Sequence, residues 1–381
     1  MVSQSPKNCY NLVLACPIIP TPHSSQSADM FDAMLTQLGP WLKGEGPQND
    51  IVISSRIRLA RNISGFPFIS KATELDRQRI EETVYRAVKN LREKEELYEI
   101  DLEPLTQLQC QMLFERQLIS REIAETQGPR AVYIANDESY SIMVNEEDHI
   151  RMQAMTSGLD LHKVWERINS LDDHLESQIP YAFSAELGYQ TACPTNVGTG
   201  MRVSVMMHLP ALNMSQEIDK VFRGLQKLNL AVRGIYGEGS QALGEFYQIS
   251  NQITLGRSET ELIEQVQEIV ERIVQYERKA RESLREANEE ALLDKASRAL
   301  GVLKTAHSMS SEEAMHLLSM LRLAVNMTLL DVPKVSLINE LLLFTQPAHL
   351  QQLSESELSP SNRDLARAQY LRKRLGEIAN L

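Results

Sequence analysis

Hydrophobic and polar residues alternate in several short segments of the chain, as expected of half-buried β-strands. The clearest segment runs over residues 53–59, and shorter ones cover 131–135, 140–144 and 249–255. These segments are rich in valine, isoleucine and tyrosine, which favour strands. The pattern predicts a sheet assembled from strands that are separated by helices.

Other segments repeat hydrophobic residues every three to four positions, which predicts helices. One helix is expected over residues 31–42, and another buries Ile80, Val84 and Leu91 on one face. A long helix should begin after Ser258, because Ser258 and Glu261 have the spacing of a capping box.

Beyond residue 287 the pattern is helical throughout, with helices expected over residues 312–327, 334–344 and 361–379. A chain of 381 residues can bury more than one core. We therefore predict an α+β domain over residues 30–287 and a small all-α domain over residues 288–381. Residues 1–29 are rich in serine and proline, and we expect a disordered tail or a start codon assigned too early.

The predicted strand at 53–59 carries two arginines on its polar face. Arg56 and Arg58 lie two residues apart, so their side chains are about 6.6 Å from each other on one face. Guanidinium groups this close repel each other unless an anion lies between them. A triphosphate meets this requirement, although a solvated basic edge strand would show the same pattern.

Three further blocks resolve this ambiguity. Residues 193–206 contain a glycine-rich loop at Gly198 and Gly200, followed by a strand that carries Arg202. We expect these glycines to let the backbone approach a ligand closely. Residues 145–151 combine three acids with Arg151, and residues 233–240 place Arg233 in another glycine-rich loop.

Five arginines together with neighbouring acids indicate phosphoryl transfer, which depends on positioning and on neutralising the charge of the transferred group. Arginine suits this task because its planar fork binds phosphate oxygens through two hydrogen bonds. The sequence contains neither a GxxxxGK[ST] loop nor a GxGxxG fingerprint after a strand. A P-loop enzyme and a dinucleotide-binding enzyme are therefore excluded.

Composition narrows the partners and the compartment. The net charge of −12 and the pI near 5.3 argue against nucleic acid as the main partner. An acidic body would attract proteins that display arginine. Four cysteines are too few for a disulfide framework in a chain of this length, so we expect a cytoplasmic location.

Four motifs resemble those of the ATP:guanidino phosphotransferases, the family of creatine and arginine kinases. They read SSRIRLARN from Ser54, NEEDHIR from Asn145, CPTNVGTGMR from Cys193 and RGIYGEGS from Arg233. The resemblance extends from about Met30 to Leu381. It implies a phosphagen-kinase-like catalytic domain with a central antiparallel sheet flanked by helices, followed by a small helical domain, and it implies ATP with Mg²⁺ as the phosphoryl source.

The resemblance also implies which residues contact ATP. They are Ser54, Ser55, Arg56, Ile57, Arg58, Gln117, Arg151, Arg202, Val203, Ser204, Val205, Met206, Arg233, Gly234, Ile235, Tyr236, Gly237 and Glu238. The family usually has histidine where this chain has Gln117. Glutamine still forms hydrogen bonds, so we expect altered nucleotide contacts and retained activity.

Three residues are implied to act on the acceptor guanidinium: Glu147, Glu238 and Cys193. A guanidinium has a pKa above 12, so its nitrogen is a poor nucleophile until a proton is removed. Glu147 would orient the group and take the proton, Glu238 would hold it from a second side, and the Cys193 thiolate would contact a nitrogen. His149 and His208 have no metal-ligand spacing and are expected to be structural.

Residues Arg363, Asp364, Arg367 and Ala368 form an RDxxRA motif in the last predicted helix. This motif resembles the phosphoarginine-binding, allosteric motif of the bacterial branch that phosphorylates arginine residues in proteins. The branch implies a role in stress response, with a heat-shock repressor among the substrates, a zinc-finger activator, a Clp protease that receives marked proteins, and a homodimer or higher oligomer.

Two alternatives remain open from the sequence. The first is a kinase for a free guanidino compound such as arginine, which differs only in its acceptor. The second is a non-catalytic adaptor with a kinase fold, which the departure at Gln117 would allow.

Overall fold

The computed structural model describes residues 30–92, 96–234, 243–330, 334–354 and 357–377. Its centre is one eight-stranded sheet in the order β2-β3-β4-β5-β1-β8-β10-β9, and every neighbouring pair is antiparallel. The strands are β1 (Val52–Arg61), β2 (Leu97–Asp101), β3 (Ala131–Ala135), β4 (Tyr140–Val144), β5 (Ile150–Ser157), β8 (Met201–His208), β9 (Leu230–Gly234) and β10 (Phe246–Asn251). A small hairpin pairs β6 (Phe183–Ser184) with β7 (Gly188–Tyr189).

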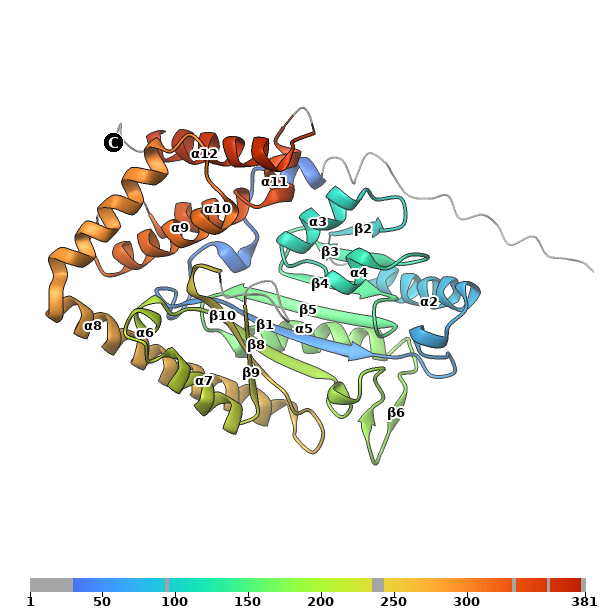
Figure 1. The fold of residues 1–381 in the computed structure, drawn as a ribbon. Coiled ribbons are helices and arrows are strands. Elements are labelled where there is room, and N and C mark those ends of the chain that lie inside the picture. Colours follow the sequence, from blue (N-terminus) through green and yellow to red (C-terminus); the bar gives the residue numbers. More distant parts are fainter. Residues whose placement is uncertain (1–29, 93–95, 235–242, 331–333, 355–356, 378–381) are drawn as a thin grey trace, which may run out of the picture.

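Helices flank the sheet and continue beyond it (Figure 1). They are α2 (Glu74–Arg92), α3 (Gln107–Glu115), α4 (Arg121–Glu125), α5 (Leu161–Glu176), α6 (Pro210–Met214), α7 (Ile218–Lys227), α8 (Glu259–Thr305), α9 (Ser311–Asn326), α10 (Val335–Phe344), α11 (Pro347–Gln352) and α12 (Pro360–Gly376). Short 3₁₀ helices are η1 (Pro40–Leu42), η2 (Ile69–Lys71), η3 (Pro194–Asn196) and η4 (Leu243–Glu245). The antiparallel sheet flanked by helices and the helical C-terminal region confirm the predicted fold class.

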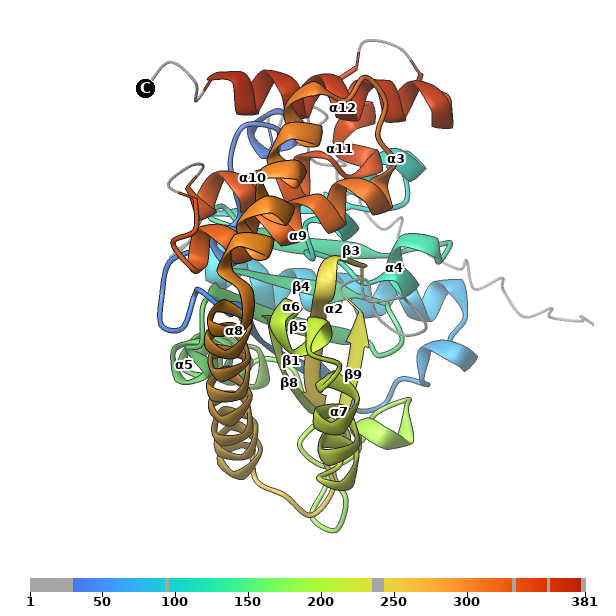
Figure 2. The ribbon, with the colours of Figure 1, turned by 60° about the vertical axis from the view of Figure 1, so that its left-hand side comes forward.

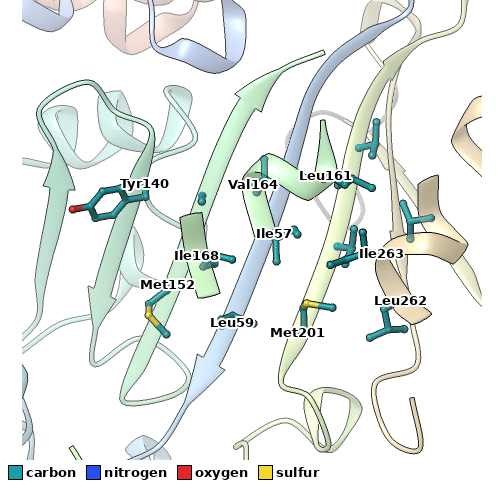
Figure 3. Close-up of a cluster of buried hydrophobic side chains, with 14 of the residues drawn as sticks. Ile57, Leu59, Tyr140, Met152, Leu161, Val164, Ile168, Met201, Leu262 and Ile263 are labelled. Atoms are coloured by element: carbon teal, nitrogen blue, oxygen red, sulfur yellow. The ribbon is translucent and has the colours of Figure 1, made fainter. Parts of the chain in front are cut away.

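One face of the sheet forms the larger hydrophobic core. Figure 3 shows side chains of the central strands pointing at α5 and at the start of α8. They are Ile57 and Leu59 of β1, Met152 of β5 and Met201 of β8, opposite Leu161, Val164, Ile168, Leu262 and Ile263. All nine are almost fully buried, so this face is closed to ligands.

The opposite face is apolar only in part. Met143, Met155 and Met206 join a second hydrophobic cluster with residues of α3, α9, α10 and α12. The C-terminal helices therefore pack toward this side of the sheet, as the two views show (Figures 1 and 2). What lies between these methionines is the polar surface described below.

Helix α8 links the sheet to the C-terminal helices. The capping box predicted from Ser258 and Glu261 is present at its start. The helix bends at Asn288, which has φ −168° and ψ 85°, and beyond the bend it leads to α9 (Figure 2). Asn288 is the first residue of the helical domain predicted from the sequence.

A buried polar network joins the sheet to α9. Arg322 donates hydrogen bonds to the main-chain oxygens of Asn49 (2.6 Å) and Asp50 (3.0 Å) and to Nδ1 of His208 (3.1 Å). Burial, together with the charge of Arg281, lowers the pKa of Arg322 to about 9. Nε2 of His208 bonds Ser319 at 2.8 Å, so the prediction that His208 is structural is confirmed.

Two predicted elements were wrong in extent. The helix expected over residues 31–42 stops after residue 34, and the chain forms only the 3₁₀ turn η1 before Lys43, because Pro40 cannot continue a helix that begins upstream. The strand expected over 249–255 ends at Asn251, whose side chain bonds the main chain of Met201, Val203 and Ile253 in place of a further ladder.

We expect the buried ion pair between Arg61 and Asp172 to be a main determinant of stability. Arg61 is 1% exposed, donates to both oxygens of Asp172 and also bonds the main-chain oxygen of Thr199. Asp172→Ala should lower the free energy of unfolding by about 3–5 kcal/mol, because it leaves a buried cation unpaired. Denaturant unfolding checks this. Asp294→Ala, which breaks the exposed pair with Arg298, should cause no measurable change.

Candidate active site

Strand register places the five predicted arginines on one face of the sheet. Directly opposed residues of neighbouring strands share a face. Arg58 lies opposite Arg202 of β8 and opposite Gln153 of β5, and Arg151 follows two residues from Gln153. These three strands therefore contribute to one polar surface, which we call the arginine face.

The edge strand β9 supplies the remaining arginine of the arginine face. Arg233 lies opposite Gln248 of β10, and Gln248 lies opposite Met206 of β8. Met206 lies two residues from Ser204 on β8, so their side chains share a face, and Ser204 is paired with Arg56 of β1. Sequence spacing alone could place Arg56 and Arg58 together, but only the strand order adds the other three.

Arg56 is held in place by three side chains. It donates hydrogen bonds to Oε1 of Gln117 (3.0 Å), to Oε1 of Gln248 (3.1 Å) and, at the distance limit, to Oγ of Ser204 (3.5 Å). Burial, reinforced by the charge of Arg202, lowers the pKa of Arg56 to about 10. Gln117, which the sequence predicts to contact ATP, therefore lies against Arg56, and its contact with ATP stays a prediction.

Arg58 is the least compensated charge on the surface. Burial and then the charges of Arg56, Arg151 and Arg202 hold its pKa well below the usual value. Among the described residues its side chain makes no hydrogen bond or ion pair, and only the negative charge of Glu146 opposes the effect. A half-buried cation without a partner is costly, so this position is suited to a bound anion.

Arg151 differs from Arg58 because acids surround it. Its Nη1 lies 2.5 Å from Glu146, and its Nη2 lies 3.0 Å from Glu147 and 3.8 Å from Asp148. Burial lowers its pKa, but the three carboxylates outweigh burial and raise it overall. All three acids belong to the hairpin loop between β4 and β5.

Only one of these three acids is accessible. The side chains of Glu146 and Asp148 are 0% exposed, whereas that of Glu147 is 43% exposed. Glu146 also accepts a hydrogen bond from Ser120 at 2.5 Å, and Asp148 accepts one from Asn62 at 2.7 Å. Glu147 is therefore the acid of this loop that can meet a second substrate.

Asp148 brings Cys193 to the same place. Its Oδ1 accepts a hydrogen bond from the amide of Ala192 at 2.7 Å. Glu147 directly precedes Asp148 in the chain, and Cys193 directly follows Ala192. The Cys193 sulfur lies 3.0 Å from Oγ1 of Thr195, and Cys193 is partly exposed. This bond brings together the two loops that carry two of the three predicted catalytic residues, and Glu147 bonds Arg151 of the arginine face.

His149 supports the acidic loop from behind. Its Nδ1 accepts from the amide of Ile63 at 2.9 Å, and its Nε2 lies 2.9 Å from the carbonyl of Pro67. The first contact fixes the proton on Nε2. The prediction that His149 is structural is confirmed.

Several predicted nucleotide ligands point away from the arginine face. The side chains of Ile57, Val203 and Val205 are buried in the opposite hydrophobic core, and Ser55 bonds the carbonyl of Gly158 at 2.8 Å. A motif quoted as a continuous run includes both faces of a strand. The side chains of these four residues are therefore not part of the arginine face, and their contact with ATP stays a prediction, whereas Ser54, Ser204 and Met206 share the face of Arg56.

The loop glycines serve the protein's own packing. A Cβ at Gly198 would lie 2.6 Å from the oxygen of Thr254, and one at Gly200 would lie 2.6 Å from the oxygen of Ala60. Both residues have positive φ, which favours glycine. The expectation that they make room for a ligand is wrong, because the space is filled by neighbouring backbone.

Part of the predicted site lies outside the described residues. This applies to Ile235, Tyr236, Gly237 and Glu238. Gly234, the last residue of β9, is described and is paired with Tyr247.

Sequence reasoning missed three residues that shape this surface. Gln248 and Trp41 line a narrow pocket with Arg56, Gln117 and Met206, and Asp148 anchors the loop of Cys193. Gln248 could have been found, because a glutamine inside an apolar strand needs a partner. Trp41 carried no signal, since its position depends on contacts far apart in the sequence.

Comparisons with known proteins agree with this geometry. Residues 79–280 match the family described as ATP:guanido phosphotransferase, C-terminal catalytic domain. Residues 289–381 match the protein-arginine kinase McsB C-terminal domain. The first match includes Glu147, Cys193 and Arg202.

Whole-length relatives make the assignment firm. A protein-arginine kinase of Moorella thermoacetica is 45% identical over 338 residues, which cover 88% of this chain and 97% of that protein. One of Halothermothrix orenii is 41% identical over 344 residues, covering 90% and 98%. The chain belongs to the ATP:guanido phosphotransferases, among their protein-arginine kinases. It is a kinase, so the alternative of a non-catalytic adaptor is set aside.

Solved structures of relatives share the fold of this kinase. The duplicated taurocyamine kinase of Schistosoma mansoni, with transition state analog components, aligns with a TM-score of 0.56 at 26% identity. That alignment covers 64% of this chain but only 35% of the duplicated one. A lombricine kinase aligns with a TM-score of 0.54 at 25% identity, covering 64% of this chain and 70% of that one.

Proposed function

We propose that this kinase transfers the γ-phosphate of ATP to arginine side chains of proteins. The observation that carries the proposal is the arginine face, which ends beside Glu147, the one accessible acid of its loop. Whole-length relatives named protein-arginine kinases favour protein as the acceptor over a free guanidino compound. Taurocyamine and lombricine kinases support only the shared fold.

The chemistry follows from the charges. Arg56, Arg58 and Arg202 hold the triphosphate and neutralise the charge that develops on the transferred group. Glu147 accepts a proton from the acceptor guanidinium, and the freed nitrogen lone pair forms the bond to Pγ. The bond between Pγ and the β–γ bridging oxygen breaks, and ADP leaves with its electron pair. Cys193 holds the guanidinium from another side, and Glu238 is proposed as the second carboxylate.

Mg²⁺ would enter with the nucleotide. Among the described residues there is no cluster of three or more histidine, cysteine or acidic side chains that could hold a metal. This fits Mg²⁺, which is usually held by substrate phosphates and waters with few protein ligands. When bound, it would neutralise charge between the β- and γ-phosphates. We propose ATP with Mg²⁺ as the working substrate.

The wider role is proposed from the same relationship. Among the described residues, no helix is long and apolar enough to cross a membrane. We propose a cytoplasmic stress-response kinase that acts as a homodimer or larger oligomer. A heat-shock repressor as substrate, a zinc-finger activator and a Clp protease as receiver of marked proteins are parts of this proposal.

The acceptor is tested by offering free arginine and an arginine-rich protein in separate reactions with ATP. We expect phosphoarginine on the protein, detected by mass spectrometry under non-acidic handling, since the P–N bond hydrolyses in acid. Phosphorylation of free arginine alone would contradict the proposal and leave the phosphotransferase assignment intact.

We further propose that the RDxxRA motif of α12 binds phosphoarginine. Arg367 is 2% exposed and donates to the carbonyls of Met309 and Thr345, each at 2.9 Å, and to Asp364 at 2.6 Å. Ala368 is buried in the core. The accessible members are Asp364, which would grip the guanidinium, and Arg363, which would contact the phosphate, while Arg367 orients Asp364.

The combined change Arg363→Gln and Asp364→Asn should abolish binding of phosphoarginine and leave basal phosphorylation largely unchanged. Both side chains are more accessible than Arg367, so their loss should not unfold the helix. Calorimetric titration with phosphoarginine measures the effect, and the exposed Lys373→Gln on the same helix is the matched control. Equal affinity in wild type and the double variant would show that the motif is only a surface of the helix.

A further inference from the structure

A buried carboxylate joins the C-terminal helices to the arginine face. Glu115, the last residue of α3, accepts hydrogen bonds from the amides of Ala348 (2.9 Å) and His349 (3.2 Å). Its Oε2 also lies 2.8 Å from Nδ1 of His349. Glu115 is 3% exposed and closes the first turn of α11, whose residues lie more than 230 positions away in the sequence. Helix N-termini favour such a negative charge.

The ring of His349 takes part in the contact between α3 and α11. Burial lowers the pKa of His349, and the 2.8 Å contact with the Glu115 carboxylate, which can only accept, places a proton on Nδ1. Among the described residues, its Nε2 has no hydrogen-bond partner although it is buried. Such an unsatisfied atom is costly. Among the described residues, Glu115 is therefore the one hydrogen-bond partner of the His349 ring.

Gln117 lies two residues beyond Glu115 and contacts Arg56 of the arginine face. Gln117 has φ 62°, a left-handed conformation that non-glycine residues adopt only when their surroundings enforce it. Its Oε1 accepts from Arg56 at 3.0 Å, and its main-chain oxygen accepts from Gln153 at 2.6 Å. Both partners belong to the arginine face.

The intervening residue is also fixed. Arg116 is 0% exposed and donates to Glu138 and to the carbonyls of Met34 and Gln37. The segment 115–117 therefore has little freedom of its own. A displacement of Glu115 would be passed on to Gln117.

On its other side, α11 adjoins the terminal helix. Thr345, two residues before Pro347, accepts a hydrogen bond from Nε of Arg367, which also pairs with Asp364. Hydrogen bonds, joined by short stretches of chain at 345–348 and 115–117, thus connect α12 through Thr345, the first turn of α11 and Glu115 to Gln117 and Arg56. The described ribbon brings α3 and α11 together in both views (Figures 1 and 2).

We infer that Glu115 is a positioning residue through which the C-terminal helices set the affinity of the arginine face for ATP. The inference rests on the proposed role of Arg56 and Gln117 in nucleotide binding. A change at α12 that displaces Thr345 would move the start of α11, and with it Glu115 and Gln117. Such coupling requires that the two ends favour the same arrangement of this segment.

A double-mutant cycle on the full-length chain tests the inference. Gln117→Ala should raise the KM for ATP about three- to tenfold, as expected for the loss of one hydrogen bond, with kcat little changed. Glu115→Gln should do the same, because an amide cannot accept all three bonds. In the Gln117→Ala background, Glu115→Gln should have almost no further effect on KM, since it acts through Gln117.

Asn326→Ala is the matched control. Its side chain also links the C-terminal helices to the rest of the chain, through the carbonyl of Asp50 at 3.1 Å, but it does not lead to Gln117. Its KM for ATP should equal that of wild type. If Glu115→Gln does not fold, His349→Ala, which removes only the ring contact, takes its place in the cycle.

The outcomes separate the inference from the proposed function. The role of Glu115 would be overturned by an unchanged KM in Glu115→Gln. It would also be overturned if the effects of Glu115→Gln and Gln117→Ala on KM multiplied in the double variant. Neither result would contradict nucleotide binding by the arginine face. An unchanged KM in Gln117→Ala would show that Gln117 takes no part in nucleotide binding, and it would overturn the inference as well. Protein phosphorylation by all variants remains a separate readout of the reaction itself.

Discussion

Glu147→Gln should lower kcat by about 10²–10⁴ and leave ATP affinity unchanged, because general base catalysis typically contributes a factor of this size. The substitution keeps the shape of the side chain and an oxygen that can accept from Arg151, which lies 3.0 Å away in the wild type. Only the ability to take a proton from the acceptor is lost. Turnover with a protein acceptor and ATP binding by calorimetry measure the two quantities separately.

The control for this prediction is Glu122→Gln, an exposed acid in α4. It should have wild-type turnover. Wild-type turnover in Glu147→Gln would show that the accessible acid of the loop takes no part in proton transfer.

Arg58→Met should reduce kcat/KM by about 10²–10³, the effect of removing one preorganised donor from a developing charge. The same substitution should raise the melting temperature of the nucleotide-free protein by about 1–3 °C. The reason is that Arg58 is repelled by Arg56, Arg151 and Arg202 and, among the described residues, has no hydrogen-bond partner. Replacing an uncompensated, half-buried cation with an apolar side chain should stabilise the fold.

Arg56→Met provides the contrast, because Arg56 is bonded to Gln117, Gln248 and Ser204. It should lose activity and also melt at a lower temperature. Parallel melting and activity measurements decide between the two patterns. A lower melting temperature for Arg58→Met would mean that Arg58 stabilises the free protein and is not reserved for an anion.

Only two of the five arginines of the arginine face could be placed together from local sequence, because strand alternation fixes which side chains of one strand share a face. Arg56 and Arg58 required only that residues 53–59 form a strand. The positions of Arg151, Arg202 and Arg233 beside them depend on the order of strands in the sheet. In that order β1 lies between β5 and β8, although these strands are far apart in the chain. No local pattern specifies such an order.

The misreadings have a common physical cause. Gly198 and Gly200 were expected to admit a ligand, but they admit the backbone of Thr254 and Ala60. Close approach between distant segments gives the same local signal as close approach to a ligand. The partners of Glu115 in α11 are likewise far away in the sequence, so the residues around Glu115 give no sign that it caps the first turn of that helix.

The most direct test of the account is a crystal structure of the full chain with Mg²⁺ and a non-hydrolysable ATP analogue. The triphosphate should lie on the arginine face between β5, β1 and β8, contact Arg56, Arg58 and Arg202, and direct its γ-phosphate toward Glu147 and Cys193. A triphosphate bound elsewhere, with Arg58 still lacking an anionic partner, would contradict the account.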